Sequence, residues 1–366
     1  MPLGTKTSKR ARRRRAGHAK TIPRNPFVAM LSTVQKDIDE RLESFFGDKL
    51  ELVAPHGREV AAMVASLARF ALRGGKRLRP ALLVAGYRLA APEGNVEPAL
   101  DAGLALELLH TYLLVHDDWM DGDALRRGGP TVHAELGKRF KHEHLGNSSA
   151  ILAGDYAAGL ATEVLAGVKM PPARAAALFQ AFAEMQLQAI LGQELDIAAT
   201  DVDPEDVYVL KTGSYTVRGP LRMGALLGGA KPATLKALDG YSLPVGIAFQ
   251  LADDMLSAFG NPGATGKALG NDLRAGKRTP LVLEALRRAR GRDRTTLKGV
   301  FGKARASDAE IRRALDVIAR SGAKEKMEAR IEELLGQGLS ALGSGVSRVG
   351  RELLEGAALA LTARRV

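Results

Sequence analysis

Apolar residues recur at intervals of three and four positions through almost the whole chain from Phe27 onward. This spacing is typical of helices with a buried face, and the abundance of Ala and Leu with little β-branched alternation favours helices over strands. Several segments are apolar on more than one face, as in 173–199, and such helices belong inside a bundle. The pattern predicts an all-α fold, one large helical domain over 27–366, with helices at 28–46, 57–72, 77–91, 96–120, 147–168, 173–199, 204–229, 233–258, 278–291, 308–320, 323–342 and 345–363.

Composition narrows the class of protein. The chain has 366 residues, 46% of them hydrophobic, which is enough for a large core. No run approaches the roughly 18 consecutive apolar residues of a membrane-spanning helix. The sequence contains no cysteine, which excludes disulfides, thiolate metal sites and a cysteine nucleophile. This composition fits a reducing compartment, and we expect a cytoplasmic protein.

The net charge of +12 is concentrated at one end of the chain. Nine Lys and Arg lie in residues 1–26, no acid occurs before Asp37, and the remaining chain carries only +3. A segment with so few large apolar residues is expected to be a disordered tail. Peripheral contact of this tail with anionic lipid stays open. Binding of nucleic acid is not expected, because the charge is confined to a tail without interleaved aromatic residues.

Two aspartate-rich motifs lie near the ends of long apolar segments. The first contains Asp117, Asp118 and Asp121, and the second runs from Gln250 to Asp254. Asp117 and Asp121, four residues apart, project from one face of a helix. Carboxylates at a helix C-terminus meet the negative end of the helix dipole and repel each other, so they require a cation. Mg²⁺ suits this pattern, since it takes one or two carboxylates and completes its shell with water and phosphate oxygens.

Basic motifs accompany the acidic ones. Gly74 to Pro80 places Lys76 and Arg79 at the start of a helix, where backbone N–H groups also favour an anion. Arg126 and Arg127 follow the first acidic motif and are suited to bidentate contacts with phosphate. Gly213, after Lys211 and Thr212, predicts a helix kink or a close approach of another segment. Acidic and basic clusters together indicate a diphosphate held through Mg²⁺ on one side and by Arg and Lys on the other.

The ordered set of five motifs resembles the trans-type isoprenyl diphosphate synthases, or polyprenyl synthetases, over roughly 27–366. Asp117 to Asp121 matches the DDxxD motif of that family, Gly75 to Pro80 matches GKRxRP, and Arg126 to Gly128 matches RRG. Lys211 to Gly213 and Gln250 to Asp254 match the two remaining motifs. The resemblance implies an isoprenoid-synthase bundle with a central active-site cavity. It also implies head-to-tail condensation of isopentenyl diphosphate with an allylic diphosphate through an allylic carbocation.

The family's site residues transfer to matching positions of this sequence. The resemblance implies that isopentenyl diphosphate is held by Lys76, Arg79, His110 and Arg127. It implies three Mg²⁺ ions for the allylic diphosphate, with a metal-binding set of Asp117, Asp118, Asp121, Asp253 and Asp254. Contacts to the oxygens of that diphosphate are expected from Arg126, Lys211, Lys267 and Lys277. Thr212 and Gln250 are expected to face the breaking bond and the carbocation, so the catalytic set is Lys211, Thr212 and Gln250.

Product length and assembly rest on the same resemblance. Tyr112, five residues before Asp117, matches the aromatic residue that limits elongation, and Leu113 beside it is smaller. This combination resembles the archaeal type of geranylgeranyl diphosphate synthase, so a C20 product is favoured over the C15 farnesyl diphosphate. Ser257 replaces the third acid of the second motif, which leaves a catalytically silent subunit as an alternative. A terpene cyclase is a further alternative, although it needs no second diphosphate site. The family implies a homodimer.

Overall fold

The computed structural model describes residues 25–198, 201–260, 269–343 and 346–363. The predicted tail lies outside this part of the chain apart from residues 25 and 26, and so does Lys267. The first helix begins at Pro26, where the Asn25 side chain caps it by accepting from the backbone N–H of Phe27 at 3.0 Å. Asn25 also donates to the carbonyl of Gly356 at 2.9 Å, which ties this helix start to the last helix.

Helices make up nearly all of the described chain, which confirms the predicted fold class. One two-residue antiparallel hairpin, in which Leu125 pairs with Pro130, is the strand structure of the described residues. The elements are α1 (Pro26–Val53), η1 (Ala54–His56), α2 (Arg58–Leu72), α3 (Leu78–Ala90), α4 (Glu97–Met120), β1 (Leu125–Arg126), β2 (Gly129–Pro130), α5 (Val132–Phe140), α6 (Glu143–Gly167), α7 (Pro172–Ile197), α8 (Pro204–Tyr208), η2 (Val209–Arg218), α9 (Gly219–Gly228), α10 (Pro232–Phe259), α12 (Asn271–Ala275), α13 (Pro280–Arg288), α14 (Gly291–Val300), α15 (Asp308–Arg320), α16 (Ala323–Ala341) and α17 (Arg348–Thr362). The predicted ranges correspond to these helices, but α5, α12 and α14 were not predicted.

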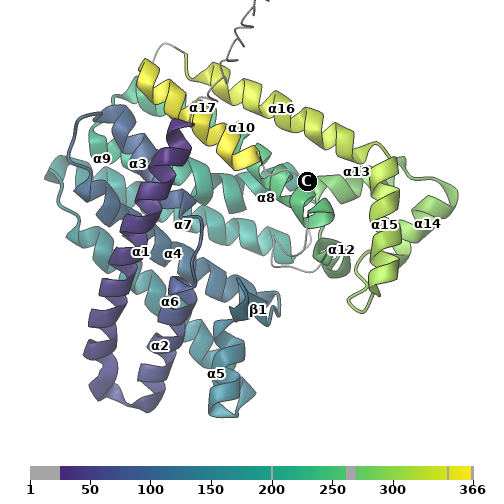
Figure 1. Cartoon of the computed structure of the whole chain (residues 1–366), viewed down its shortest axis with the longest axis horizontal. Coiled ribbons are helices and arrows are strands. Elements are labelled where there is room, and N and C mark those ends of the chain that lie inside the picture. Colours follow the sequence, from purple (N-terminus) through teal and green to yellow (C-terminus); the bar gives the residue numbers. More distant parts are fainter. Residues whose placement is uncertain (1–24, 199–200, 261–268, 344–345, 364–366) are drawn as a thin grey trace, which may run out of the picture.

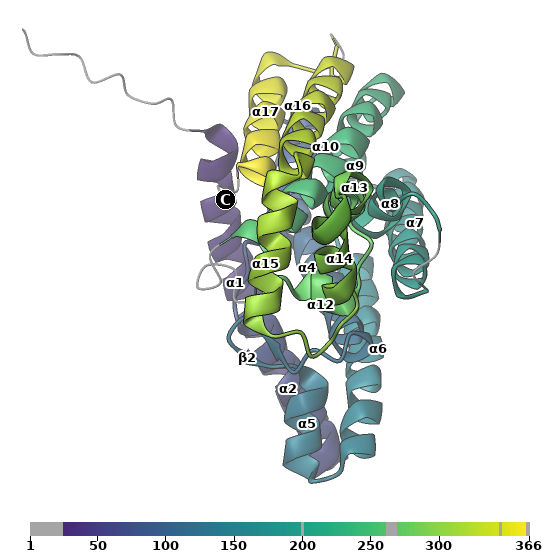
Figure 2. The ribbon, with the colours of Figure 1, turned by 90° about the vertical axis from the view of Figure 1, so that its right-hand side faces the viewer.

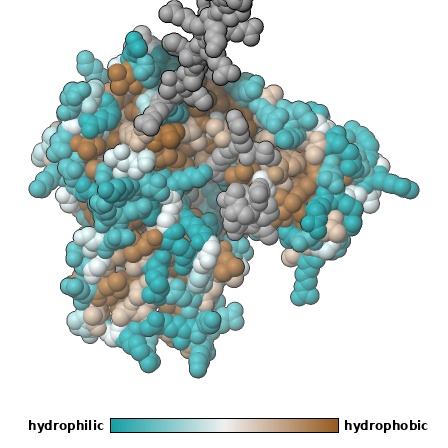
Figure 3. Space-filling model, viewed as in Figure 1, coloured by the Kyte–Doolittle hydropathy of each residue, from teal (hydrophilic) through white to brown (hydrophobic). Residues whose placement is uncertain are grey.

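The helices form a bundle with a smaller lobe at one end. In Figure 1 the bundle lies on the left, α16 and α17 cross its top, and α13 to α15 project on the right. Figure 2 brings this lobe to the front. Its outer surface is mostly hydrophilic in Figure 3. Helix α10 contributes buried residues to the cores of both parts, Val245 to the bundle and Leu251 to the lobe, and therefore connects them.

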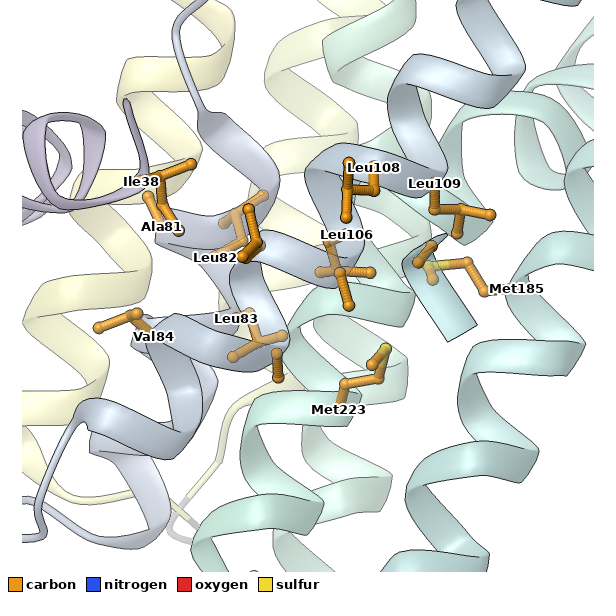
Figure 4. Close-up of a cluster of buried hydrophobic side chains, with 14 of the residues drawn as sticks. Ile38, Ala81, Leu82, Leu83, Val84, Leu106, Leu108, Leu109, Met185 and Met223 are labelled. Carbon is orange, nitrogen blue, oxygen red and sulfur yellow. The ribbon is translucent and has the colours of Figure 1, made fainter. Parts of the chain in front are cut away.

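The core of the bundle is built on α3 and α4. Figure 4 shows their side chains, including Leu82 and Leu106, close to Ile38 of α1 and Met185 of α7. Helix α4 is long and apolar enough to cross a membrane by length and composition alone. However, 67% of its apolar stretch is buried inside the protein, as expected of a core helix. Its hydrophobicity therefore serves packing, and it carries the first acidic motif at its C-terminal end.

The predicted irregularity at Gly213 is a π-helix, η2. Insertions of this kind are rare and often occur at functional sites. Gly246 of α10 packs directly against this segment, because a Cβ on Gly246 would lie 2.7 Å from the Cα of Gly213. A Cβ on Gly192 of α7 would lie 2.4 Å from the backbone nitrogen of Lys211. These glycines let α7, η2 and α10 approach closely, which brings Lys211 and Thr212 to the site described below.

Candidate active site

A polar pocket of about 610 Å³ lies between the loop before α3, helix α4, the hairpin, η2 and α10. It brings together residues from Gln35 to Asp253, which are 218 positions apart in the sequence. Of the predicted site residues, its lining includes Lys76, Arg79, His110, Arg126, Arg127, Thr212, Gln250 and Asp253. The basic and acidic motifs that we expected to meet at one diphosphate site therefore lie around one pocket.

The basic side of the pocket is organised around the loop that precedes α3. Arg127 donates to the carbonyl of Gly74, and a Cβ on Gly75 would lie 3.1 Å from its guanidinium, so the loop passes directly beneath this side chain. Arg79 lies over the ring of Tyr215, with 4.3 Å between guanidinium carbon and ring centroid, and donates to Thr216 at 2.8 Å. These contacts hold the two guanidinium groups at the pocket wall, and the cationic wall suits a diphosphate.

His110 lies at the base of this wall. It is 8% exposed, and its Nδ1 has no hydrogen-bond partner among the described residues. Burial, followed by the charges of Arg79 and Arg127, lowers the pKa of His110 well below its usual value. The imidazole is therefore neutral at physiological pH, and one ring nitrogen is left for a ligand.

The acidic side of the site begins at the end of α4. Asp117 lies 3.4 Å from the Lys211 ammonium and 3.2 Å from the Arg126 guanidinium, and Asp121 lies 3.0 Å from the Lys277 ammonium. Burial acts to raise the pKa of Asp117, but the charges of Lys211, Arg126 and Lys277 outweigh it and hold this pKa below its usual value. Asp117 is therefore ionised and able to bind a cation.

Asp118 has different surroundings from its neighbours. Its carboxylate is fully buried, accepts from Arg126 Nε at 2.5 Å, and leaves its second oxygen without a hydrogen-bond partner among the described residues. Burial raises the pKa of Asp118 to about 6 despite the charge of Arg126. Its predicted role in metal binding stays a prediction, and the geometry gives it a second task of holding Arg126 at the pocket.

A hydrogen-bond chain connects η2 to α10. Thr212 donates to the amide oxygen of Gln250 at 2.8 Å, and the Gln250 amide nitrogen donates to Asp254 at 2.9 Å. Tyr208 donates to the other oxygen of Asp254, and burial raises the pKa of Asp254 well above its usual value. The amide oxygen of Gln250 is thereby turned towards Thr212 at the pocket, while Asp253 lines the pocket itself.

These acids fit a hard divalent cation bound jointly with its ligand. No cluster of three metal-binding side chains occurs among the described residues. Instead, carboxylates reach the site singly or in pairs from α4 and α10, which is the donor set of Mg²⁺ that keeps positions for phosphate oxygens. The residues present therefore suit a metal–diphosphate complex better than an all-protein metal cage.

An apolar cavity of about 180 Å³ adjoins the polar pocket. Leu114 and Tyr215 line both spaces, and Asp117 and Lys211 also line the apolar one. Its walls come from α4, α7 and η2, and those from α4 and α7 include Tyr112, Leu113, His116, Met120, Ala189, Ile190 and Ile197. The predicted chain-length residues Tyr112 and Leu113 thus line a cavity that a hydrocarbon chain could enter.

Asp196, Tyr208 and Tyr215 lie at the site but were not predicted from the sequence. Asp196, near the end of α7, accepts from Lys211 Nζ at 2.5 Å, and Tyr208 donates to Asp254. Asp196 follows a long apolar segment, as the two predicted acidic motifs do. This shared position could have identified Asp196 as a site residue. Tyr208 had no such signal, because a single aromatic residue on a helix is usually packing.

Acidic helix ends, basic loops and an adjoining apolar cavity define an enzyme class that binds diphosphates bearing hydrocarbon chains. The chain belongs to the polyprenyl synthetase family, whose model matches residues 61–318. It is thus a transferase of the trans-prenyl diphosphate synthase type. It is 35% identical over 266 residues to geranylfarnesyl diphosphate synthase of Aeropyrum pernix, which covers 70% of this chain and 79% of the relative.

Other relatives agree. Geranylgeranyl diphosphate synthase of Methanosarcina mazei is 34% identical over 68% of this chain and 73% of its own length. A solved structure of geranylgeranyl pyrophosphate synthase from Corynebacterium glutamicum, complexed with isoprenyl diphosphate and magnesium, superposes with a TM-score of 0.85. That protein is 35% identical, and the match covers 92% of this chain and 99% of the other. The family and fold that the motifs implied are therefore confirmed.

Proposed function

We propose that this protein condenses isopentenyl diphosphate head-to-tail with allylic diphosphates in a Mg²⁺-dependent reaction, with geranylgeranyl diphosphate as main product. The observation that carries the proposal is the junction of a polar pocket and an apolar cavity at Leu114 and Tyr215. A cationic wall binds the diphosphate of isopentenyl diphosphate, and the adjoining cavity takes the tail of the allylic substrate. A terpene cyclase would not need the wall formed by Lys76, Arg79 and Arg127.

The residues around the acidic helix ends explain how the carbon–oxygen bond is broken. As the diphosphate leaves, negative charge develops on its oxygens, and Lys211, Lys277 and Arg126 are in place to stabilise it. Asp117, Asp121 and Asp253 would hold the metal, three ions in our proposal, and bound Mg²⁺ supplies Lewis-acid stabilisation of the same oxygens.

The carbocation and the proton are handled by other groups. In the proposal, the oxygens of Thr212 and Gln250, which are hydrogen-bonded to each other at 2.8 Å, face the carbon that becomes cationic, and apolar walls keep water from it. The alkene of isopentenyl diphosphate then attacks this carbon. We assign the final proton to the departed diphosphate, because the pocket offers no obvious protein base.

Tyr112 and Leu113 set the product length in this proposal. Tyr112 forms an edge-to-face contact with His116, with ring centroids 5.0 Å apart, and this contact holds the ring in the cavity wall. A C20 product then follows when the chain reaches Tyr112. A C15 product is the second candidate, because a (2E,6E)-farnesyl diphosphate synthase of Mycobacterium bovis is also 33% identical over 75% of this chain.

We also propose a cytoplasmic homodimer. Leu187 and Leu191 lie one turn apart on α7 and are 62% and 59% exposed, and Leu152 on α6 is 58% exposed. Large apolar side chains exposed on neighbouring turns favour coverage by a second copy. Light scattering after size exclusion tests this, and a monomer at micromolar concentration would contradict it. We further propose peripheral contact between the basic residues of 1–26 and anionic lipid.

Product analysis by mass spectrometry tests the reaction. The enzyme is incubated with isopentenyl diphosphate, Mg²⁺ and dimethylallyl, geranyl or farnesyl diphosphate in separate reactions. We expect a C20 product and loss of turnover with EDTA that Mg²⁺ restores. Turnover resistant to EDTA would contradict the metal assignment, and products made without consumption of isopentenyl diphosphate would indicate a cyclase. No turnover with any starter would indicate a silent subunit.

A further inference from the structure

Arg77 stands between the proposed substrate-binding residues Lys76 and Arg79 and also lines the polar pocket, but its guanidinium group is bound by other parts of the protein. Its side chain is only 2% exposed, and each guanidinium nitrogen is used by the protein itself. Nε donates to Asp39 of α1 at 2.8 Å, Nη1 donates to Glu107 of α4 at 2.7 Å, and Nη2 donates to the carbonyl of Ala71 at 3.0 Å. All three guanidinium nitrogens of Arg77 are therefore engaged by the protein, which fixes the position of this side chain.

The backbone at Arg77 shows what these contacts do. Its φ is 46°, in the left-handed region that residues other than glycine rarely adopt. Gly74 and Gly75 before it have φ values of 86° and 159°. Such a loop keeps its shape only when its surroundings fix it, and the three contacts of Arg77 tie it to α1, α2 and α4. The turn at Arg77 is also the point where α3 begins, so it sets the directions of Lys76 and Arg79.

Glu107 extends this tie to the other half of the pocket. It is 2% exposed and lies one helical turn before His110 on α4. Arg77 and Glu107 are therefore a buried ion pair that connects the loop bearing Lys76 directly to the helix turn bearing His110. A buried pair of this kind is weak evidence for stability but can specify one geometry among several.

We propose that the Arg77–Glu107 pair is a positioning device for the isopentenyl diphosphate site, fixing Lys76 and Arg79 relative to His110. The inference rests on the proposed function, because it assigns these residues to the non-allylic substrate. It predicts a defect confined to that substrate. The proposed allylic site lies at the C-terminal ends of α4 and α10, where Asp117 contacts Arg126 and Lys211, whereas the hydrogen bonds of Arg77 go to Asp39, Glu107 and Ala71.

The test replaces both members of the pair. Removing one charge would leave the other buried and unpaired, which could unfold the protein, whereas Arg77→Met with Glu107→Met removes both. Arg41→Met is the matched control, since Arg41 also bridges α1 and α4, through Glu97 and Asp101, but away from the loop. Both proteins are measured for melting temperature, for kcat and KM with each substrate, and for binding of isopentenyl diphosphate alone by calorimetry.

We expect the double variant to keep a cooperative melt and to raise KM and Kd for isopentenyl diphosphate about tenfold or more. KM for the allylic substrate should stay within about threefold, and Arg41→Met should change neither constant by more than that. An unchanged KM and Kd for isopentenyl diphosphate in the folded double variant would overturn the proposal. Equal defects for both substrates would also overturn it, because they indicate a general structural role.

The double variant could fail to fold, or the wild-type protein could fail to bind isopentenyl diphosphate. If the double variant does not fold, Glu107→Gln, which keeps the size of the side chain, carries the same comparison of KM values. If the wild-type protein itself does not bind isopentenyl diphosphate, the proposed function fails. A failure of this inference alone instead gives normal wild-type binding and an unaffected double variant.

Discussion

Truncation of Tyr112 to alanine tests the assignment of product length. Tyr112 is half-buried in the wall of the 180 Å³ cavity, and its principal ring contact is with His116. Full truncation of a buried aromatic costs about 3–5 kcal/mol, and half-burial reduces this to about 2 kcal/mol, or a few degrees in Tm. The variant should therefore fold.

The gain for a longer product is larger than this cost. One further isoprene unit buries five carbons, which at about 0.8 kcal/mol each amounts to about 4 kcal/mol, or about a thousandfold in equilibrium. If Tyr112 is what excludes that unit, Tyr112→Ala should shift the main product from C20 to C25 or longer. Tyr112→Phe keeps the ring and should leave the product unchanged. Leu113→Phe adds bulk to the same wall and should shorten the product to C15.

The assay is mass spectrometry of the dephosphorylated products, with farnesyl or geranylgeranyl diphosphate as starter. Single-turnover rates with geranylgeranyl diphosphate separate an enlarged cavity from slower product release. A folded Tyr112→Ala enzyme that still stops at C20 would refute the reasoning. The floor of the cavity would then lie elsewhere along α4 or α7.

Three further predictions follow from the charges. Lys211→Met removes the cation beside Asp117 and Asp196 and should lower kcat about 10²-fold or more with a small change in Tm, measured by steady-state kinetics. The pKa of His110 is lowered in the folded protein, so below about pH 6.5 the unfolded chain binds a proton at this residue that the folded protein does not. The free energy of unfolding therefore falls by up to about 1.4 kcal/mol for each pH unit of acidification in this range. The free energy of unfolding, measured with urea at pH 7.5 and 5.5, should thus fall less on acidification for His110→Gln than for wild type. Deletion of residues 1–26 should leave kcat and KM in solution nearly unchanged, and a large loss of turnover would show that this segment is not a passive extension.

The helices and the convergence of motifs could be predicted because both follow from local patterns. Apolar periodicity located α4, α7 and α10 almost to the residue. The unpredicted helices are short, and α14 buries only Leu297 and Val300, so its periodic signal is weak. Such helices form because the lobe packs around them, which is tertiary information.

Side-chain orientation within a motif was harder to predict than the motif itself. Asp117 and Asp118 are adjacent and chemically equal, yet Asp117 lines the apolar cavity between Lys211 and Arg126, whereas Asp118 is buried against Arg126. Successive residues on a helix point about 100° apart, so which of the two faces the cavity depends on how α4 is rotated in the bundle. Gly213 gives a similar lesson, because the sequence indicated an irregularity but could not identify Gly246 as the segment that approaches it.

In the proposed function, the junction at Tyr215 suits two substrates that each carry a diphosphate and a hydrocarbon part. Tyr215 supports Arg79 through its ring face on the polar side and lines the apolar cavity on the other. The two substrates must bring one carbon each to within bonding distance, so the new carbon–carbon bond has to form where the two spaces meet. The aromatic ring of Tyr215 holds the Arg79 guanidinium by a cation–π contact and so fixes the cationic wall. The same ring is a large apolar group at the junction, where it keeps water out of the apolar cavity. Replacing Tyr215 with leucine should therefore affect both substrates together, raising KM for isopentenyl diphosphate through Arg79 and lowering kcat through the exposed junction. A change in only one of these constants, measured with both substrates varied, would show that Tyr215 belongs to one site and not to the junction.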